Sequence, residues 1–243
     1  MHPIMPLSRL YAGFLDLLYP RRCPVCSEIV MPKGNLICPD CMEKLAFVRR
    51  PVCKCCGKEI ISPEAEYCFD CTRHPHSFDS GMALINYNDT ASRSMALIKY
   101  HGRREYLDFY SEAMFRRFGP AIRRLSPDCI IPVPVHKSRL KKRGFNQAEI
   151  VAKVLSENTE IAMEAGAVKR IKATIPQKDL GDKGRKRNIR GAFTVQKNVK
   201  RRKYCSDRRH LYDRKYLRRG GESAEKGRRP KCILLTVSIG QGI

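Results

Sequence analysis

The sequence predicts a two-part α/β protein, in which a small cysteine-rich module precedes a larger domain with a largely parallel sheet. Three observations lead to this prediction. The chain has 243 residues, more than the roughly 100–200 residues of one typical domain. Nine of its twelve cysteines lie within residues 23–71. From residue 82 onward, strand-like and helix-like segments alternate, which is typical of a parallel sheet covered by helices.

The cysteines form a pattern that occurs twice. Two Cys-x-x-Cys pairs are separated by eleven residues, and the same arrangement returns thirty positions later. Each pair can present two thiolates to one tetrahedral ion, and two pairs complete a closed structural zinc site. The predicted zinc ligands are Cys23, Cys26, Cys38, Cys41, Cys53, Cys56, Cys68 and Cys71. The spacing leaves open whether they hold one Zn²⁺ ion or two, and which pairs share an ion.

Disulfides fit this pattern less well than metal binding, because no export signal precedes the cysteines. The alternative is a set of reduced cysteines or a redox pair. The segments between the pairs are too short to bury a core, so the metal is expected to supply much of the folding energy. Cys55 is a spare cysteine, and His74 and His76 are interpreted as parts of a structural loop.

The predicted domains are an N-terminal helix over 1–20, a double zinc ribbon over 21–75 and an α/β domain over 78–243. The apolar run at 10–18 contains Asp16 and lacks the basic start and cleavage site of a signal peptide. No stretch approaches the roughly 18 apolar residues of a membrane span. We therefore expect a cytoplasmic protein without a membrane span.

Within the larger domain the elements are expected in a fixed order. Residues 82–87 resemble a strand and 90–100 a helix; one or two amphipathic helices follow over 104–125. A buried strand is predicted over 129–135, and a helix over 144–155 that is opened by a basic loop. Glycines and acidic residues between 177 and 187 suggest a mobile loop.

The basic loop at 136–143 is the most informative segment of this domain. It carries Lys137, Arg139 and Arg143 and leads to Asn146 and Gln147 at the start of the next helix. Cationic and amide side chains at a helix start are suited to phosphate. A solvated charged loop is the alternative.

Several ordered motifs together resemble the ComF family of bacterial phosphoribosyltransferase-like proteins. The cysteine repeat is followed by Leu-Ile-Lys-Tyr-His-Gly at 97–102, Ile-Pro-Val-Pro-Val at 131–135 and Arg-Gly-Phe-Asn-Gln at 143–147. Thr-Ile-Pro-Gln at 174–177, Arg-Asn at 187–188 and Gly-Ala-Phe at 191–193 complete the series. The resemblance covers about residues 8–200 and 235–242.

This resemblance implies a type I phosphoribosyltransferase fold behind the zinc ribbon, a transferase-class activity and, for some members, a part in DNA uptake during competence. It also implies a phosphorylated ribose ligand, with Mg²⁺ and phosphoribosyl pyrophosphate in intact relatives, and single-stranded DNA and the competence helicase machinery as partners. The candidate ligand residues are Lys99, Arg103, Lys137, Arg139, Arg143, Asn146, Gln147, Gln177, Arg187 and Asn188. For the loop at 100–104, a helix C-cap at Gly102 explains the residues equally well.

One expected motif is missing from the chain. The resemblance calls for an apolar strand that ends in two acidic residues, followed by a Thr-Thr-Gly-Ser/Thr-Thr loop for the 5-phosphate. Residues 201–234 instead carry 13 Lys/Arg and 4 Asp/Glu, hence +9 of the net charge of +24, without helical or strand periodicity. Codons read from the second base over 204–216 permit Ile-Val-Leu-Ile-Asp-Asp-Ile-Tyr-Thr-Thr-Gly-Ser-Thr. We interpret 201–234 as a frameshifted, poorly ordered segment.

Three functional hypotheses follow. The first is a phosphoribosyltransferase-like protein that binds a ribose 5-phosphate donor, with donor binding impaired here. The second is a non-enzymatic, single-stranded DNA-binding competence factor, for which only Phe145 is well placed to stack on bases. The third is a zinc-stabilised scaffold with a damaged second domain. Without the frameshifted segment the chain would still carry +15.

Overall fold

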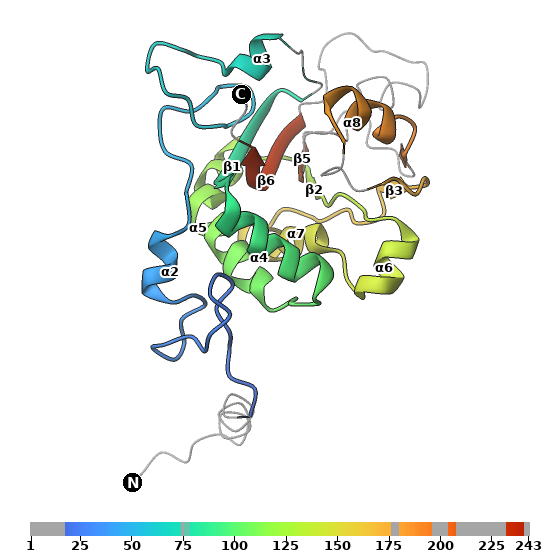
Figure 1. Ribbon diagram of the computed structural model, residues 1–243. Coiled ribbons are helices and arrows are strands. Elements are labelled where there is room, and N and C mark those ends of the chain that lie inside the picture. Colours follow the sequence, from blue (N-terminus) through green and yellow to red (C-terminus); the bar gives the residue numbers. More distant parts are fainter. Residues whose placement is uncertain are drawn as a thin grey trace.

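The structure is a computed structural model that describes residues 18–73, 76, 78–175, 180–195, 204–207 and 232–240. Its centre is a four-stranded parallel sheet in the order β1-β6-β5-β2 (Figure 1). The strands are β1 (Ser80–Tyr87), β2 (Cys129–Ile131), β5 (Tyr204–Asp207) and β6 (Cys232–Gly240). A separate antiparallel pair consists of β3 (Val168–Arg170) and β4 (Phe193–Val195). The predicted α/β class with a parallel sheet is confirmed.

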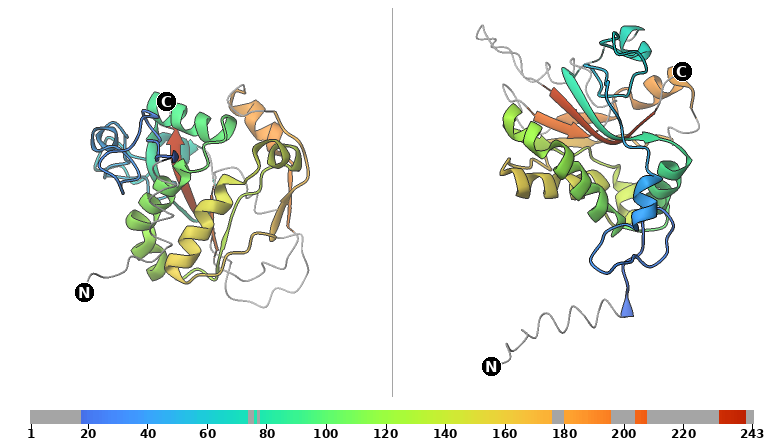
Figure 2. Two further views of the ribbon diagram at one scale, coloured as in Figure 1. Left: turned by 90° about the horizontal axis from the view of Figure 1, so that it is seen from below. Right: turned by 90° about the vertical axis from the view of Figure 1, so that its left-hand side faces the viewer.

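Helices cover one face of this sheet (Figure 2). They are α4 (Asp89–Tyr100), α5 (Tyr106–Leu125) and α7 (Gln147–Thr159). The side chain of Asn88 caps α4 by accepting a hydrogen bond from the Ala91 N–H at 2.9 Å. Their apolar faces pack against Ile130, Ile233 and Leu235 of the sheet in one buried cluster.

The cysteine-rich repeats lie on opposite sides of the sheet. Cys23 and Cys41 of the first repeat belong to the buried cluster on the helix side. Cys53 and Cys56 of the second repeat instead share a cluster with Leu234 and other residues of the opposite face. Successive side chains of a strand point to opposite faces, which explains why neighbouring residues of β6 contribute to different clusters.

The chain between the two repeats covers the outer edge of β1. Phe47 forms a β-bridge with Ile85, and the Val48 N–H donates to the Leu84 carbonyl at 3.0 Å. Such coverage satisfies backbone groups that an edge strand would otherwise expose. Short helices complete the repeats, α2 (Pro39–Glu43) in the first and α3 (Phe69–Arg73) in the second.

The structure corrects several expected boundaries. The strand predicted over 129–135 ends at Ile131, because Pro132 and Pro134 have no backbone N–H to donate. The expected basic loop is a helix, α6 (Lys137–Arg143), and part of the expected mobile loop is α8 (Asp182–Ile189). Within the segment that lacks periodicity, 204–207 and 232–234 are strands. The predicted helix over 1–20 lies almost entirely outside the described residues.

Candidate metal centres and ligand site

The eight predicted zinc ligands form two separate clusters. Cys23, Cys26, Cys38 and Cys41 lie together, and so do the four cysteines of the second repeat. Within each cluster all sulfur atoms are within 4.8 Å of one another. The pairing that the spacing leaves open is therefore sequential, with one site in each repeat.

The sulfur geometry fits tetrahedral zinc. The Cys26 and Cys38 sulfurs are 3.9 Å apart, and those of Cys56 and Cys68 are 3.7 Å apart. A Zn–S bond of about 2.3 Å places two sulfurs of a tetrahedron about 3.8 Å apart. A disulfide would require about 2.05 Å. The residues present therefore suit a closed structural zinc site in each repeat.

The same local backbone turn builds both sites. The Ser27 N–H donates to the Cys23 carbonyl at 3.0 Å, and the Gly57 N–H donates to the Cys53 carbonyl at 2.9 Å. Ser27 and Gly57 have φ values of +67° and +72°, in the left-handed region. These turns fold each Cys-x-x-Cys segment back on itself and direct its two sulfurs toward one point.

The pKa values of the cysteine thiols also favour the binding of a metal cation. Burial opposes ionisation of Cys23 and Cys53, but backbone N–H groups donate to their sulfurs and lower the pKa of each to about 7. Burial and the neighbouring sulfurs raise the pKa of Cys38 to about 11 and of Cys41 to about 12, and they also raise the pKa of Cys71. Full ionisation of a cluster therefore needs the positive charge of a metal ion.

An ion pair that the sequence reasoning missed supports the second ribbon. The Lys58 ammonium lies 2.5 Å from the Asp70 carboxylate, and the Lys58 side chain is only 6% exposed. The pair joins the first turn of this ribbon to α3. Lys58 directly follows Gly57 in the repeated turn, but sequence spacing alone does not place it opposite Asp70.

Several candidate ligand residues converge where α4, α6 and α7 meet. The Arg143 guanidinium at the end of α6 donates to the Lys99 carbonyl at 3.0 Å and also to the Gln147 side-chain oxygen. Asn146 is buried; it caps α7 and donates to the Val133 carbonyl at 3.1 Å. In this structure the Asn146 side chain therefore orders the loop around the site.

A second group of contacts extends this site toward α8. The Arg139 guanidinium donates to the Thr174 carbonyl at 2.6 Å, and the Asn188 amide donates to the Ile175 carbonyl at 3.0 Å. Arg187 lies on the same helix and is exposed. The segment at 174–175 is thus held from both sides by side chains that belong to the sequence motifs.

The remaining candidates are less well integrated. Lys137 is exposed on α6, and Arg103 lies 3.7 Å from Glu105 in a partly exposed ion pair. Gln177 lies outside the described residues. The phosphate-binding loop proposed by the shifted reading over 212–216 also lies outside them.

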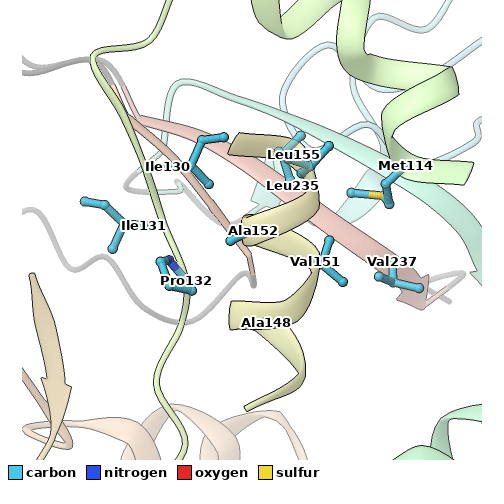
Figure 3. A pocket seen from close by; sticks show the side chains of 10 residues that line it. All are labelled: Met114, Ile130, Ile131, Pro132, Ala148, Val151, Ala152, Leu155, Leu235 and Val237. Carbon is cyan, nitrogen blue, oxygen red and sulfur yellow. The ribbon is translucent and has the colours of Figure 1, made fainter. Parts of the chain in front are cut away.

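The described residues also enclose an apolar hollow between α7 and the sheet (Figure 3). Its lining side chains are aliphatic or thioether groups and offer no charged partner to a phosphate. They are Met114, Ile130, Ile131, Pro132, Ala148, Val151, Ala152, Leu155, Leu235 and Val237. This hollow belongs to the core, and the polar groups of the candidate ligand site lie elsewhere.

Comparison with known proteins agrees with the cysteine-rich double ribbon. Residues 14–72 match the double zinc ribbon domain family. The chain is 28% identical to Competence protein F of Haemophilus influenzae over 181 residues, 72% of this chain and 76% of that protein. It is 27% identical to DNA utilization protein YhgH of Escherichia coli K12, over 74% of this chain and 73% of the relative.

A shorter match reaches Competence protein ComFC of Bacillus subtilis, with 27% identity over 49% of this chain and 51% of that protein. No solved structure matches the chain. The chain thus combines a double zinc ribbon with an α/β domain. These matches support the resemblance to the ComF family that the sequence motifs indicate.

Among the described residues, no helix combines the length and apolar character needed to cross a membrane.

Proposed function

We propose that the chain is a ComF-type protein of DNA uptake, whose α/β domain has a phosphoribosyltransferase-like fold and binds a phosphorylated ribose ligand. The observation that carries the proposal is the convergence of motif side chains on three backbone carbonyls. Arg143, Arg139 and Asn188 hold the carbonyls of Lys99, Thr174 and Ile175, respectively. The names of the relatives, competence and DNA utilization proteins, support the biological role.

The charge of α6 suits a phosphorylated ligand. Besides Arg143, four of the seven residues of this helix are Lys or Arg, and Lys141 and Lys142 are exposed. Phosphate groups favour such clusters, and Arg binds them through paired N–H donors. In the intact form, Mg²⁺ would accompany the pyrophosphate, and the acidic pair of the shifted reading would contact the ribose hydroxyls.

The frameshift proposal gains support from the position of β5. Cys205 pairs with Ile130 and Ile233, and Ser206 pairs with Ile131 and Leu234. These four neighbours are between 1% and 4% exposed. Central parallel strands are usually continuous apolar runs. The shifted reading would supply valine and leucine at positions 205 and 206 and would place the acidic pair directly after the strand.

Single-stranded DNA binding is the second candidate function. Phe145, the aromatic proposed for base stacking, is only 9% exposed and packs in the core. Tyr100 is 62% exposed and follows Lys99, so this pair offers a stacking ring beside a cation. This arrangement supports DNA binding at the C-terminal end of α4, where Arg143 also contacts the Lys99 carbonyl.

The first experiment is to resequence the gene across codons 195–240 and to prepare the restored chain beside the chain as written. Calorimetric titration with phosphoribosyl pyrophosphate and Mg²⁺ should show binding to the restored chain and at least about tenfold weaker binding to the original. Arg143→Gln in the restored chain should weaken binding, with Lys153→Gln, which removes an exposed cation of α7 outside the α6 cluster, as the matched control.

Two results would overturn the ligand proposal: a restored chain that does not bind the ligand, or equal binding by both chains. Fluorescence anisotropy with labelled oligo-dT tests the second function on the same samples. Loss of oligo-dT binding in Tyr100→Ala, with no ribose ligand bound by either chain, would favour the DNA-binding function instead.

A further inference from the structure

The second ribbon contains metal-binding side chains beyond its four zinc ligands. Cys55, Cys71 and His76 form a further cluster in which one sulfur or ring-nitrogen atom from each residue lies within 4.8 Å of the others. Cys71 belongs to the second zinc site as well, so the two clusters meet at its sulfur. All three side chains are partly exposed, which leaves room for a solvent ligand.

We propose that Cys55, Cys71 and His76 bind an additional thiolate- and imidazole-preferring divalent ion such as Zn²⁺. In this site the Cys71 thiolate bridges two ions. Cys55 and His76 contribute the second and third ligands, and water completes the tetrahedron. Thiolate and neutral imidazole are ligands that zinc prefers, and sets of three protein ligands with one solvent position are well known for zinc.

The first ribbon provides an internal comparison. The thirty-residue shift that superimposes the two repeats places Val25 at the position of Cys55 and Ala46 at that of His76. Neither side chain can ligate a metal. The four-cysteine clusters otherwise correspond residue for residue, so the additional ligands are a property of the second ribbon.

Packing orients the imidazole of His76. Its ring stacks on Phe78 with the centroids 4.9 Å apart and the planes inclined by 15°. Phe78 is 5% exposed and belongs to the buried cluster that contains Cys53 and Cys56. A ring fixed on the buried core loses less conformational entropy on binding a metal, which favours a preorganised ligand.

The charge at this site favours a second cation. Four thiolates around one Zn²⁺ leave a net charge of about −2. A second Zn²⁺ ion adds one further thiolate and a neutral imidazole, so the two ions and their ligands together carry a net charge of about −1. The additional ion therefore reduces the negative charge beside the bridging sulfur, and Cys55 must lose its proton to solvent when the ion binds.

Native mass spectrometry of the full chain, equilibrated with Zn²⁺ alone, tests the proposal. The wild-type chain should hold one ion beyond the two of the ribbon clusters. Cys55→Val and His76→Ala introduce the residues of the first ribbon, and both should lose only this additional ion. Cys129→Ala removes a buried thiol outside the clusters and should leave the zinc count unchanged.

Cobalt provides a readout that a purely structural role would not change. Co²⁺ titration should show a separate absorption band for the additional site, with mixed sulfur and nitrogen ligands, and Cys55→Val should abolish it. A wild-type zinc count limited to the two ribbon sites would overturn the proposal. An additional ion that persists in both variants would also overturn it, because that ion would be bound elsewhere. Thermal melting of each variant verifies that it remains folded.

Discussion

Gly57 lies where the second ribbon meets the first strand of the sheet, and Gly57→Ala is expected to weaken that contact. A Cβ atom at Gly57 would lie 2.4 Å from the Gly81 carbonyl oxygen and 2.9 Å from the Met82 Cα. Both contacts are with backbone, which cannot rotate away as a side chain can. The φ of +72° adds strain, because L-residues with a side chain disfavour the left-handed region.

The two contributions can be separated with matched variants. Gly34 has a φ of +96°, and a Cβ added there would meet no atom within 4 Å, so Gly34→Ala measures left-handed strain alone, about 1–2 kcal/mol. Gly81 is outside the left-handed region, but its Cβ would approach the Cys56 carbonyl oxygen to 2.8 Å. Gly81→Ala therefore measures the overlap alone, about 1–3 kcal/mol.

Gly57→Ala should combine both costs and reduce the free energy of unfolding by about 2–5 kcal/mol. For a chain of this size each kcal/mol lowers the Tm by about 2–4 °C. Thermal melting in excess Zn²⁺ should therefore show a decrease of about 4–20 °C, larger than for either control. If Gly57→Ala melts no lower than Gly34→Ala, the close packing of ribbon and strand inferred here is wrong.

Two further substitutions test interactions inside the ribbon and the helical layer. Lys58→Met removes the cation beside Asp70 and should lower the free energy of unfolding by about 1–2 kcal/mol. This is less than the cost of breaking a fully buried pair, because Asp70 is partly exposed. Urea denaturation measures the loss of stability, and the double variant with Asp70→Leu should recover part of it. Tyr110→Phe removes the 2.7 Å hydrogen bond to the buried Ser94 hydroxyl and should cost about 1 kcal/mol. Adding Ser94→Ala to this variant should then lower the free energy of unfolding only a little further. A second loss as large as the first would contradict the hydrogen bond between Tyr110 and Ser94.

The zinc sites could be predicted from the sequence because each ligand pair is local. A Cys-x-x-Cys turn fixes two sulfurs within four residues, and the thirty-residue repeat identifies the second site. The assignment of pairs to ions could not be predicted, because it depends on how Cys38 and Cys68 return to their partners. Spacing also offers no reason to link Cys55 with His76, which are far apart in the sequence and meet only in the fold.

The basic segment at 137–143 shows where local patterns mislead. Its run of cations lacks an apolar face, so the pattern favours a loop. In the structure, the side chain of His136 accepts from the Ser138 N–H and caps the start of α6. Gly144, with a φ of +81°, ends the helix with a hydrogen bond to the Leu140 carbonyl. The two caps define a helix that the hydrophobic pattern does not indicate.

The positions of the two ribbons suggest why zinc and the sheet depend on one another. Cys41 is 4% exposed among residues of the helix-side core, and Cys56 is fully buried against the opposite face. Each metal site therefore anchors apolar residues on a different side of the same strands. Because β1 pairs with β6 and also contacts the segment between the ribbons and the turn of the second ribbon, loss of either ion would loosen one covered face of the sheet. The ribbons are thus structural parts of the α/β core, and the candidate ligand site at α6 and α7 rests on a sheet that both of them support.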